Sequence, residues 1–230
     1  MKIIGHCGFR KGSKGVPSKN TRMFHGKPLF EWTIQQLQAL PNISDIVVST
    51  DDDEAYSKAI SLGCLETGLR DESLSNDTAS KFLVWKDSAK KYLAGYGDFD
   101  VMLDLDCTAP LRLLADIKNV LNLFNKNTMD IAIAITESRK NPYFNLLEYS
   151  DDGFLEISKG SGKVFSRQSA PEVFEHVSSI YVISKEYLIE GNNLYEARIK
   201  GHKIPYARSL DIDTPLDWEI VNYLFKKNDI

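Results

Sequence analysis

The 230-residue sequence has no long hydrophobic run and few cysteines. No apolar stretch approaches the ~18 to 20 residues that cross a bilayer, and the N-terminus lacks the apolar core of a signal peptide. Cys7, Cys64 and Cys107 are odd in number and widely spaced, which speaks against a disulfide framework and against a zinc site. These absences predict a cytoplasmic protein with reduced thiols and without a membrane partner.

Several catalytic and nucleotide-binding motifs are also missing. The chain contains no Walker A motif, no G-x-G-x-x-G fingerprint, no H-E-x-x-H and no G-x-S-x-G. P-loop nucleotidases, dinucleotide-dependent enzymes, zinc peptidases and serine hydrolases are therefore excluded. A formal net charge of −4 speaks against a nucleic-acid partner, which requires a broad basic surface.

Acidic residues are absent from the first 30 positions, where basic residues are concentrated. The first acid is Glu31, and the segment "FRKGSKGVPSKN" at residues 9–20 combines cations with glycine. Glycine lets backbone N–H groups approach an anion, and Arg10, Lys14 and Lys19 can neutralise it. The loop follows the first predicted strand. This pattern is typical of a phosphate-binding loop, and the alternative is a solvated surface loop.

Strands and helices alternate through the first 136 residues. Their apolar spacing predicts strands at 2–7, 45–50, 100–106 and 130–136, and helices at 28–40, 52–63 and 114–124. Such alternation is typical of right-handed βαβ units that build a mainly parallel sheet. We therefore expect an α/β fold of the Rossmann-like kind.

The pattern changes after residue 136. Residues 137–176 carry turn signals around short alternating runs, which predicts a hairpin-rich excursion. A core strand at 178–184 follows. Thr214 and Pro215 are suited to begin a last helix, whose inward-facing residues are predicted to be Leu216, Ile220, Val221 and Leu224. We expect one domain over residues 1–230, with 137–176 as its elaboration.

Two pairs of aspartates lie where ligands bind in parallel sheets, just after strands. Asp104 and Asp106 share one face of a strand, so we expect a cation between them, with magnesium as the natural choice. Alternatively, only Asp106 is functional and Asp104 caps a neighbouring loop. Asp211 and Asp213 repeat the spacing before the last helix, and one of them is alternatively a capping acid.

The basic loop and the carboxylates together indicate nucleotidyl transfer. In this reaction an acceptor oxygen attacks the α-phosphorus of a nucleoside triphosphate and pyrophosphate leaves. Catalysis then depends on positioning and on charge neutralisation. Two alternatives are a metal-dependent glycosyltransferase that reads Asp104-Leu105-Asp106 as a D-x-D motif and a non-catalytic nucleotide-binding protein of the same fold.

Seven segments match one known family in order and spacing over nearly the whole chain. They are "RKGSKGVPSKN" (10–20), "VVSTDDDE" (47–54), "LRDESLSNDTAS" (69–80), "TAPLR" (108–112), "RQSAPEVF" (167–174), "IY" (180–181) and "LDIDTPLD" (210–217). The chain thus resembles the acylneuraminate cytidylyltransferases, or CMP-sialic acid synthetases. The resemblance implies their nucleotidyltransferase fold. It also implies that CTP and a nine-carbon 2-keto sugar acid give a CMP-sugar and pyrophosphate, with Mg²⁺ or in its place Mn²⁺.

The resemblance also implies site residues and a homodimer. The triphosphate and ribose would be held by Arg10, Lys14, Lys19 and Asn20. The cytosine pocket would be lined by Arg70 and Ser80. Arg167 and Gln168 would lie beside the sugar. Asp211 and Asp213 would hold the metal, with Asp106 as a third candidate, and together with Arg10 and Lys14 they would form the catalytic set. The excursion at 137–176 would reach across to the second subunit.

Three departures from the family pattern fall among the sugar-site motifs. Asp106 replaces a glutamine, Val177 replaces an asparagine, and Phe144 replaces a lysine. The first change leaves only hydrogen-bond acceptors, and the third removes a cation. We therefore expect an altered sugar pocket for a bacterial nonulosonic acid of the legionaminate or pseudaminate type, with neuraminate as the alternative.

Overall fold

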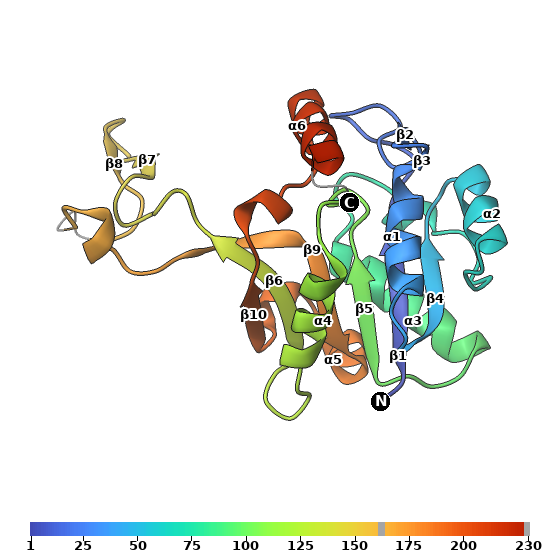
Figure 1. Cartoon of the computed structure of the whole chain (residues 1–230). Helices are drawn as coiled ribbons and strands as arrows, with labels where there is room; N and C mark the ends of the chain where they lie inside the picture. Colours follow the sequence, from blue (N-terminus) through green and yellow to red (C-terminus); the bar gives the residue numbers. More distant parts are fainter. Residues whose placement is uncertain (161–163, 228–230) are drawn as a thin grey trace.

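A six-stranded sheet forms the centre of the computed structural model, which describes residues 1–160 and 164–227 (Figure 1). In spatial order its strands are β10 (Ile199–Lys203), β6 (Ile131–Glu137), β9 (Phe174–Ser184), β5 (Val101–Leu105), β1 (Ile3–Gly8) and β4 (Ile43–Ser49). Only β9 runs against its neighbours. The predicted mainly parallel α/β sheet is thus confirmed, with one reversed strand.

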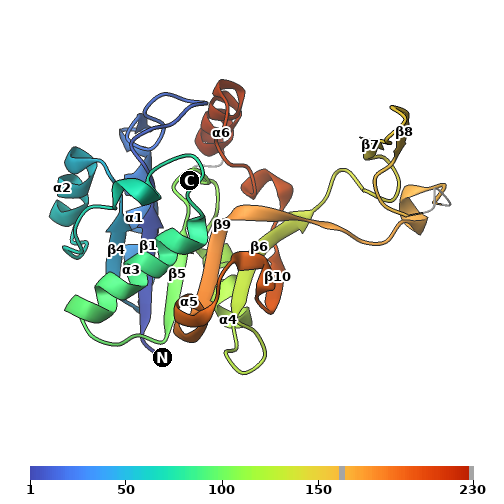
Figure 2. The same cartoon turned by 180° about the vertical axis from the view of Figure 1, so that it is seen from behind.

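Helices cover both faces of the sheet (Figures 1 and 2). One face carries α1 (Leu29–Gln38), α2 (Asp53–Ser61) and α4 (Leu114–Leu123), and the other carries α3 (Lys81–Gly95) and α5 (Lys185–Glu190). The sequence analysis did not predict α3, although Phe82, Trp85, Ala89 and Tyr92 recur at helical spacing and are buried. Among the described residues, no helix is long and apolar enough to cross a bilayer.

Side chains of β1 alternate between the two apolar layers. Ile3 and Cys7 pack with α1 and α2, whereas Ile4 packs against Trp85 and its neighbours on α3. His6 is fully buried and follows Ile4 by two positions, so it points toward the α3 layer. A polar side chain is therefore placed inside the sheet, directly below the end of β1.

A third apolar cluster joins the basic loop to the last helix, α6 (Pro215–Lys227). It includes Phe24 of β2 (Met23–Phe24), which pairs with β3 (Lys27–Pro28). Thr214 begins α6 as predicted: its N–H donates to Asp217 Oδ2 over 2.7 Å and its Oγ1 accepts from the Asp217 N–H over 3.2 Å. The cluster fixes the start of α6 beside the loop.

Two of the four residues predicted on the inward face of α6 are exposed. Val221 is fully buried and Leu224 partly buried, but Leu216 and Ile220 are exposed. Phe225 instead packs edge-on against Phe24 at a ring-centroid distance of 4.9 Å. The helix docks on a small aromatic surface, so only a narrow stripe of its apolar residues finds partners.

Residues between β6 and β9 form an arm that extends away from the sheet (Figures 1 and 2). It contains the antiparallel hairpin of β7 (Leu147–Tyr149) and β8 (Leu155–Ile157), followed by the 3-10 helix η2 (Arg167–Ser169). The other 3-10 helices are η1 (Glu72–Leu74), η3 (Leu194–Glu196) and η4 (Tyr206–Arg208). The chain leaves and re-enters the sheet at neighbouring strands, which gives β9 its reversed direction.

Gly15 provides a test of how the basic loop is held. A Cβ atom at this position would lie 1.8 Å from the backbone oxygen of Asp213, so Gly15→Ala must displace one of the two segments. We expect it to lower the free energy of unfolding by about 1 to 3 kcal/mol. Gly12→Ala in the same loop meets nothing within 4 Å and should stay within about 0.5 kcal/mol of wild type. Urea denaturation measures both, and equal stabilities of the two variants would contradict this packing.

Candidate active site

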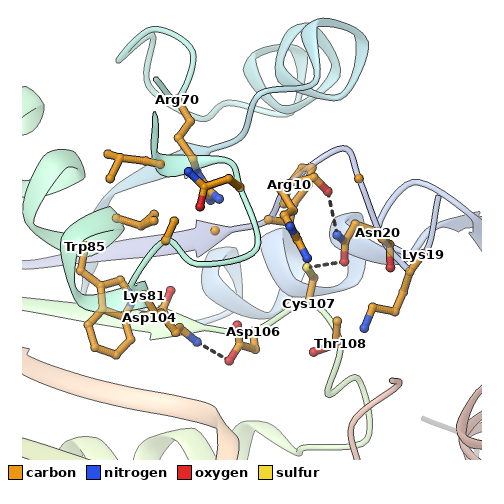
Figure 3. A pocket seen from close by; sticks show the side chains of 18 of the residues that line it. Arg10, Lys19, Asn20, Arg70, Lys81, Trp85, Asp104, Asp106, Cys107 and Thr108 are labelled. Carbon is orange, nitrogen blue, oxygen red and sulfur yellow. Dashed lines mark hydrogen bonds and ion pairs between the residues drawn. The ribbon is translucent and has the colours of Figure 1, made fainter. Parts of the chain in front are cut away.

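A cavity of about 300 Å³ opens at the carboxyl ends of β1 and β5 (Figure 3). Its walls come from the basic loop, from the segment that leads into α3, and from the residues after β5. Five of the predicted site residues line it: Arg10, Lys19, Asn20, Arg70 and Asp106. Topology alone brings them together, because the ends of parallel strands meet at one edge of the sheet.

Asn20 holds the end of the basic loop against β5. Its Nδ2 donates to the backbone oxygen of Arg10 over 3.0 Å, and its Oδ1 accepts from the Cys107 thiol over 3.3 Å (Figure 3). Both polar atoms of the amide are therefore used within the protein. These hydrogen bonds fix the position of the Arg10 backbone, and with it the point from which the Arg10 side chain extends.

Lys19 connects the same loop to the D-I-D segment. Its side chain is nearly buried, and its ammonium group donates to the backbone oxygen of Ile212 and, over 3.1 Å, to Asp213 Oδ1. Burial and the nearby charge of Asp213 raise the pKa of Asp211. The two aspartates do not line the main cavity, but Lys19, which does, holds the segment that carries them through Ile212 and Asp213.

Arg10 and Lys14 converge on one carboxylate. Asp77, in the loop after η1, lies 2.5 Å from Arg10 Nη1 through Oδ1 and forms an ion pair with Lys14 through Oδ2. The hydrogen bonds from Lys14 and Arg10 lower the pKa of Asp77. Two oxygens of one anionic group thus bridge the two cations at the edge of the cavity.

Arg70 and Ser80 do not meet in one cavity. Arg70 is anchored by Ser49, whose backbone oxygen accepts from Nη2 over 2.6 Å and whose hydroxyl accepts from Nε over 3.0 Å, and it lines the main cavity. Ser80 is the N-cap residue of α3 and lines a neighbouring cavity instead. The two predicted cytosine-site residues therefore flank the entry to α3 from different sides.

Asp104 is fully buried at the end of β5 and is paired with two partners. His6 Nδ1 lies 2.6 Å from Asp104 Oδ1, while His6 Nε2 lies 3.0 Å from the hydroxyl of Ser88. Lys81 Nζ lies 3.1 Å from Asp104 Oδ2. Burial alone would raise the pKa of Asp104, but Lys81 and His6 outweigh it and lower the pKa to about 2. Asp104 is therefore an ionised carboxylate that anchors α3, and it does not cap a loop.

Lys81 takes the position expected for magnesium between Asp104 and Asp106. Its ammonium group contacts Asp106 (Figure 3) and forms an ion pair with Asp104, and these charges raise its pKa although burial acts in the opposite direction. A cation does lie between the two carboxylates as expected, but it is the ammonium group of Lys81. The sequence analysis missed Lys81 because it missed the helix that carries it.

Arg112 fixes the backbone after β5. It is fully buried, and its guanidinium donates to the backbone oxygens of Asp106 and Ala109 and, over 2.7 Å, to the hydroxyl of Thr33. Burial raises the pKa of Asp106. Arg112 is the last residue of the motif "TAPLR", which the sequence analysis singled out. A buried arginine requires fixed oxygen partners, so the residue holds this segment in place.

The neighbouring cavity, of about 320 Å³, shares Lys81 and Trp85 with the first. Half of its lining residues carry aromatic rings, and the lining includes one formally charged side chain, that of Lys81. The lining residues are Ser80, Lys81, Phe82, Trp85, His176, Ser178, Tyr181, Asn193, Leu194 and Tyr195. Burial and the charge of Lys81 lower the pKa of His176, which favours its neutral form. Lys81 thus lies on the wall between two cavities.

Arg167 and Gln168 lie in the arm, on η2, and line neither of these cavities. Arg167 is exposed and donates from Nη2 to the backbone oxygen of Arg139 over 2.7 Å. Of the three departures from the family pattern, Phe144 also lies in the arm, whereas Val177 is buried in the core. Only Asp106 changes the lining of the main cavity.

The described residues contain no group of three or more His, Cys, Asp or Glu side chains arranged to hold a metal. Magnesium nevertheless needs only one or two carboxylates when phosphate oxygens complete its shell. Asp211 and Asp213 supply two carboxylates near each other: burial and, after it, the charge of Asp213 raise the pKa of Asp211, and a divalent cation would offset both effects. Asp106 and Asp213 each also pair with a lysine, Lys81 and Lys19 respectively.

Comparison with known proteins agrees with this arrangement. A family model described as "Cytidylyltransferase" matches residues 9–228. The chain is 33% identical over 224 residues to "Post-translational flagellin modification protein B" of Campylobacter coli, covering 96% of this chain and 94% of that protein. It is 32% identical over 216 residues to "CMP-N,N'-diacetyllegionaminic acid synthase" of Campylobacter jejuni, covering 94% and 91%.

A solved structure shares the fold. CMP:2-keto-3-deoxy-manno-octonic acid synthetase complexed with CTP superposes with a TM-score of 0.68 at 15% identity, covering 99% of this chain and 100% of that one. The nucleotidyltransferase fold and the resemblance found in the sequence are therefore confirmed, and the non-catalytic and glycosyltransferase alternatives are set aside. The chain belongs to the cytidylyltransferase family, and it is a nucleotidyltransferase.

Proposed function

We propose that this cytidylyltransferase activates a nonulosonic acid: CTP and the nine-carbon 2-keto sugar acid give a CMP-sugar and pyrophosphate. One relative is named as the synthase of CMP-N,N'-diacetyllegionaminic acid, which supports a sugar acid of this class. The observation that carries the proposal is the convergence of Arg10 and Lys14 on a single carboxylate at the edge of the cavity. Their arrangement suits a phosphate group equally well.

Arg10 and Lys14 bind the triphosphate in this proposal. The two oxygens of Asp77 bridge them, and two phosphoryl oxygens offer the same charge and a similar spacing. The triphosphate therefore displaces Asp77 when it enters. Lys19 stays bound to Ile212 and Asp213, so it holds the loop in place while its neighbours change partners.

Arg70 reads the cytosine. Its Nε and Nη2 are held by Ser49, which leaves Nη1 to donate to the carbonyl oxygen of the base. The anchored guanidinium loses little freedom on binding, so it discriminates by geometry.

Asp211 and Asp213 would hold magnesium, or Mn²⁺ in its place, and the ion would supply charge neutralisation for the phosphates. Gly15 brings the basic loop against the backbone of Asp213, and Lys19 pairs with its side chain. The phosphate-binding and metal-binding segments are therefore held together before substrate enters.

The sugar acid occupies the neighbouring cavity. Trp85, Tyr181 and Tyr195 provide aromatic walls, and Asn193 provides an amide. Aromatic faces suit the methyl groups and amide planes of acylamino substituents. This lining favours a diacylated sugar of the legionaminate type over neuraminate, which carries a single acylamino group. The buried free thiols and the need for CTP support a reaction in the cytoplasm.

A second copy of this chain completes the site. The arm presents a run of exposed apolar side chains, namely Leu147, Tyr149, Phe154, Leu155 and Phe165, and such a patch marks a protein contact. Arg167 and Gln168 lie on the same arm, away from the cavities of their own chain. In a homodimer, the arm carries them to the sugar site of the partner.

A substrate panel tests the activity. With CTP and Mg²⁺, we expect pyrophosphate release on addition of N,N'-diacetyllegionaminic acid, slower release with N-acetylneuraminic acid, and a CMP-sugar in the mass spectrum. EDTA should abolish the release and added Mg²⁺ should restore it. The proposal fails if neither acid nor pseudaminic acid yields a CMP-sugar while a known synthetase converts its own substrate in parallel.

Mixing two inactive variants tests the shared site. Lys14→Ala and Arg167→Ala should each lower kcat/KM by at least about 10-fold, because each loses a charge-assisted hydrogen bond. Random exchange of subunits makes half of the dimers mixed, with one intact site each, so the mixture should regain about a quarter of wild-type activity. If mixing and subunit exchange restore nothing, Arg167 acts within its own chain.

A further inference from the structure

Lys81 occupies an unfavourable place for a cation. It is the first residue of α3, and the N-terminus of a helix carries a partial positive charge that repels a cation. Asp104 and Asp106 offset this repulsion by binding its ammonium group. Neutralising two carboxylates explains why the lysine is tolerated, but it does not explain why the ammonium group lies on the wall between two cavities.

The ammonium group keeps at least one donor free of the carboxylates. An ammonium carries three N–H groups; one is donated to Asp106, and Asp104 forms an ion pair with the ammonium group over 3.1 Å. On the other side, Lys81 Nζ lies 4.2 Å from the ring centroid of Tyr181 and 5.2 Å from that of Trp85, so aromatic faces flank it. The side chain is 37% exposed, which leaves room for a ligand atom.

Local charges do not repel an anion at this point. Lys81 and Arg112 carry two positive charges, and Asp104 and Asp106 carry two negative charges, so the cluster is formally neutral. Among the described residues, the lining of the neighbouring cavity contains no aspartate or glutamate, and Lys81 is the only formally charged residue in it. A small anion with apolar substituents fits this cavity.

We propose that Lys81 binds the C1 carboxylate of the sugar acid through an N–H group that the two aspartates leave free, and so makes the enzyme select acids. This inference rests on the proposed function, since it identifies the group that reads that substrate. His6 and Asp104 act as positioning residues, because their 2.6 Å contact fixes the carboxylate that holds Lys81. Asp106 fixes the ammonium group from the side of the main cavity.

A purely structural role for Lys81 predicts a different result. If the lysine only neutralised Asp104 and Asp106, its removal would weaken binding of every sugar ligand by the same factor. If it binds the carboxylate, removal weakens only ligands that have one. Comparison of an acid with its amide separates the two.

Calorimetric titration of the enzyme with CTP bound makes this comparison. The probes are 2-deoxy-N,N'-diacetyllegionaminic acid, which lacks the attacking hydroxyl, and its C1 carboxamide. Wild type should prefer the acid by about 10- to 100-fold in Kd, the range of a charge-assisted hydrogen bond. Lys81→Met should bind both within about threefold of each other. Lys90→Met, an exposed lysine on the same helix, should keep the full preference.

A second variant protects the test against misfolding. Lys81→Met leaves Asp104 buried without its ammonium partner, which destabilises a protein strongly, so Lys81→Met with Asp104→Asn is titrated as well. We expect the same loss of preference. An undiminished preference in the folded variant overturns the inference and leaves the proposed function intact, and absence of binding of the acid to wild type overturns both.

Discussion

The burial of the Asp104 carboxylate constrains the whole ligand edge of the sheet. A carboxylate without solvent contact is stable only when paired and hydrogen-bonded, and here His6 from β1 and Lys81 from α3 supply the partners. The pairing ties the start of α3 to the end of β5. It also places Lys81 beside Asp106, between the two cavities.

Two kinds of charge pair coexist around this edge. Lys19 with Asp213, and Asp104 with His6, are largely or fully buried on at least one side and join separate segments of the fold. The pairs that Asp77 forms with Arg10 and Lys14 are more exposed, and exposed pairs contribute little stability. Exchange of Asp77 for a phosphate therefore costs the fold little, while the buried pairs keep the geometry of the site.

Local patterns in the sequence predicted most strands and helices and the edge of the sheet that binds ligands. Both depend on strand alternation and loop chemistry, which are encoded over a few residues. The basic loop, Asp106 and the cap at Thr214 were all recognisable in this way. The role of Lys81 was not, since it depends on pairing with carboxylates more than 20 positions away. The exposed Leu216 and Ile220 on α6 were mispredicted for a related reason: apolar spacing shows that a helix has a face, but not how much of it the neighbours cover.

The central claim is that Arg10 and Lys14 bind the triphosphate of CTP by exchanging it for Asp77. A crystal structure of the enzyme with CTP and Mg²⁺ tests it directly. The account predicts phosphate oxygens within hydrogen-bonding distance of both cations, with the Asp77 carboxylate displaced from them. Triphosphate density away from residues 10–20, or Asp77 still bound to both cations beside bound CTP, would contradict it.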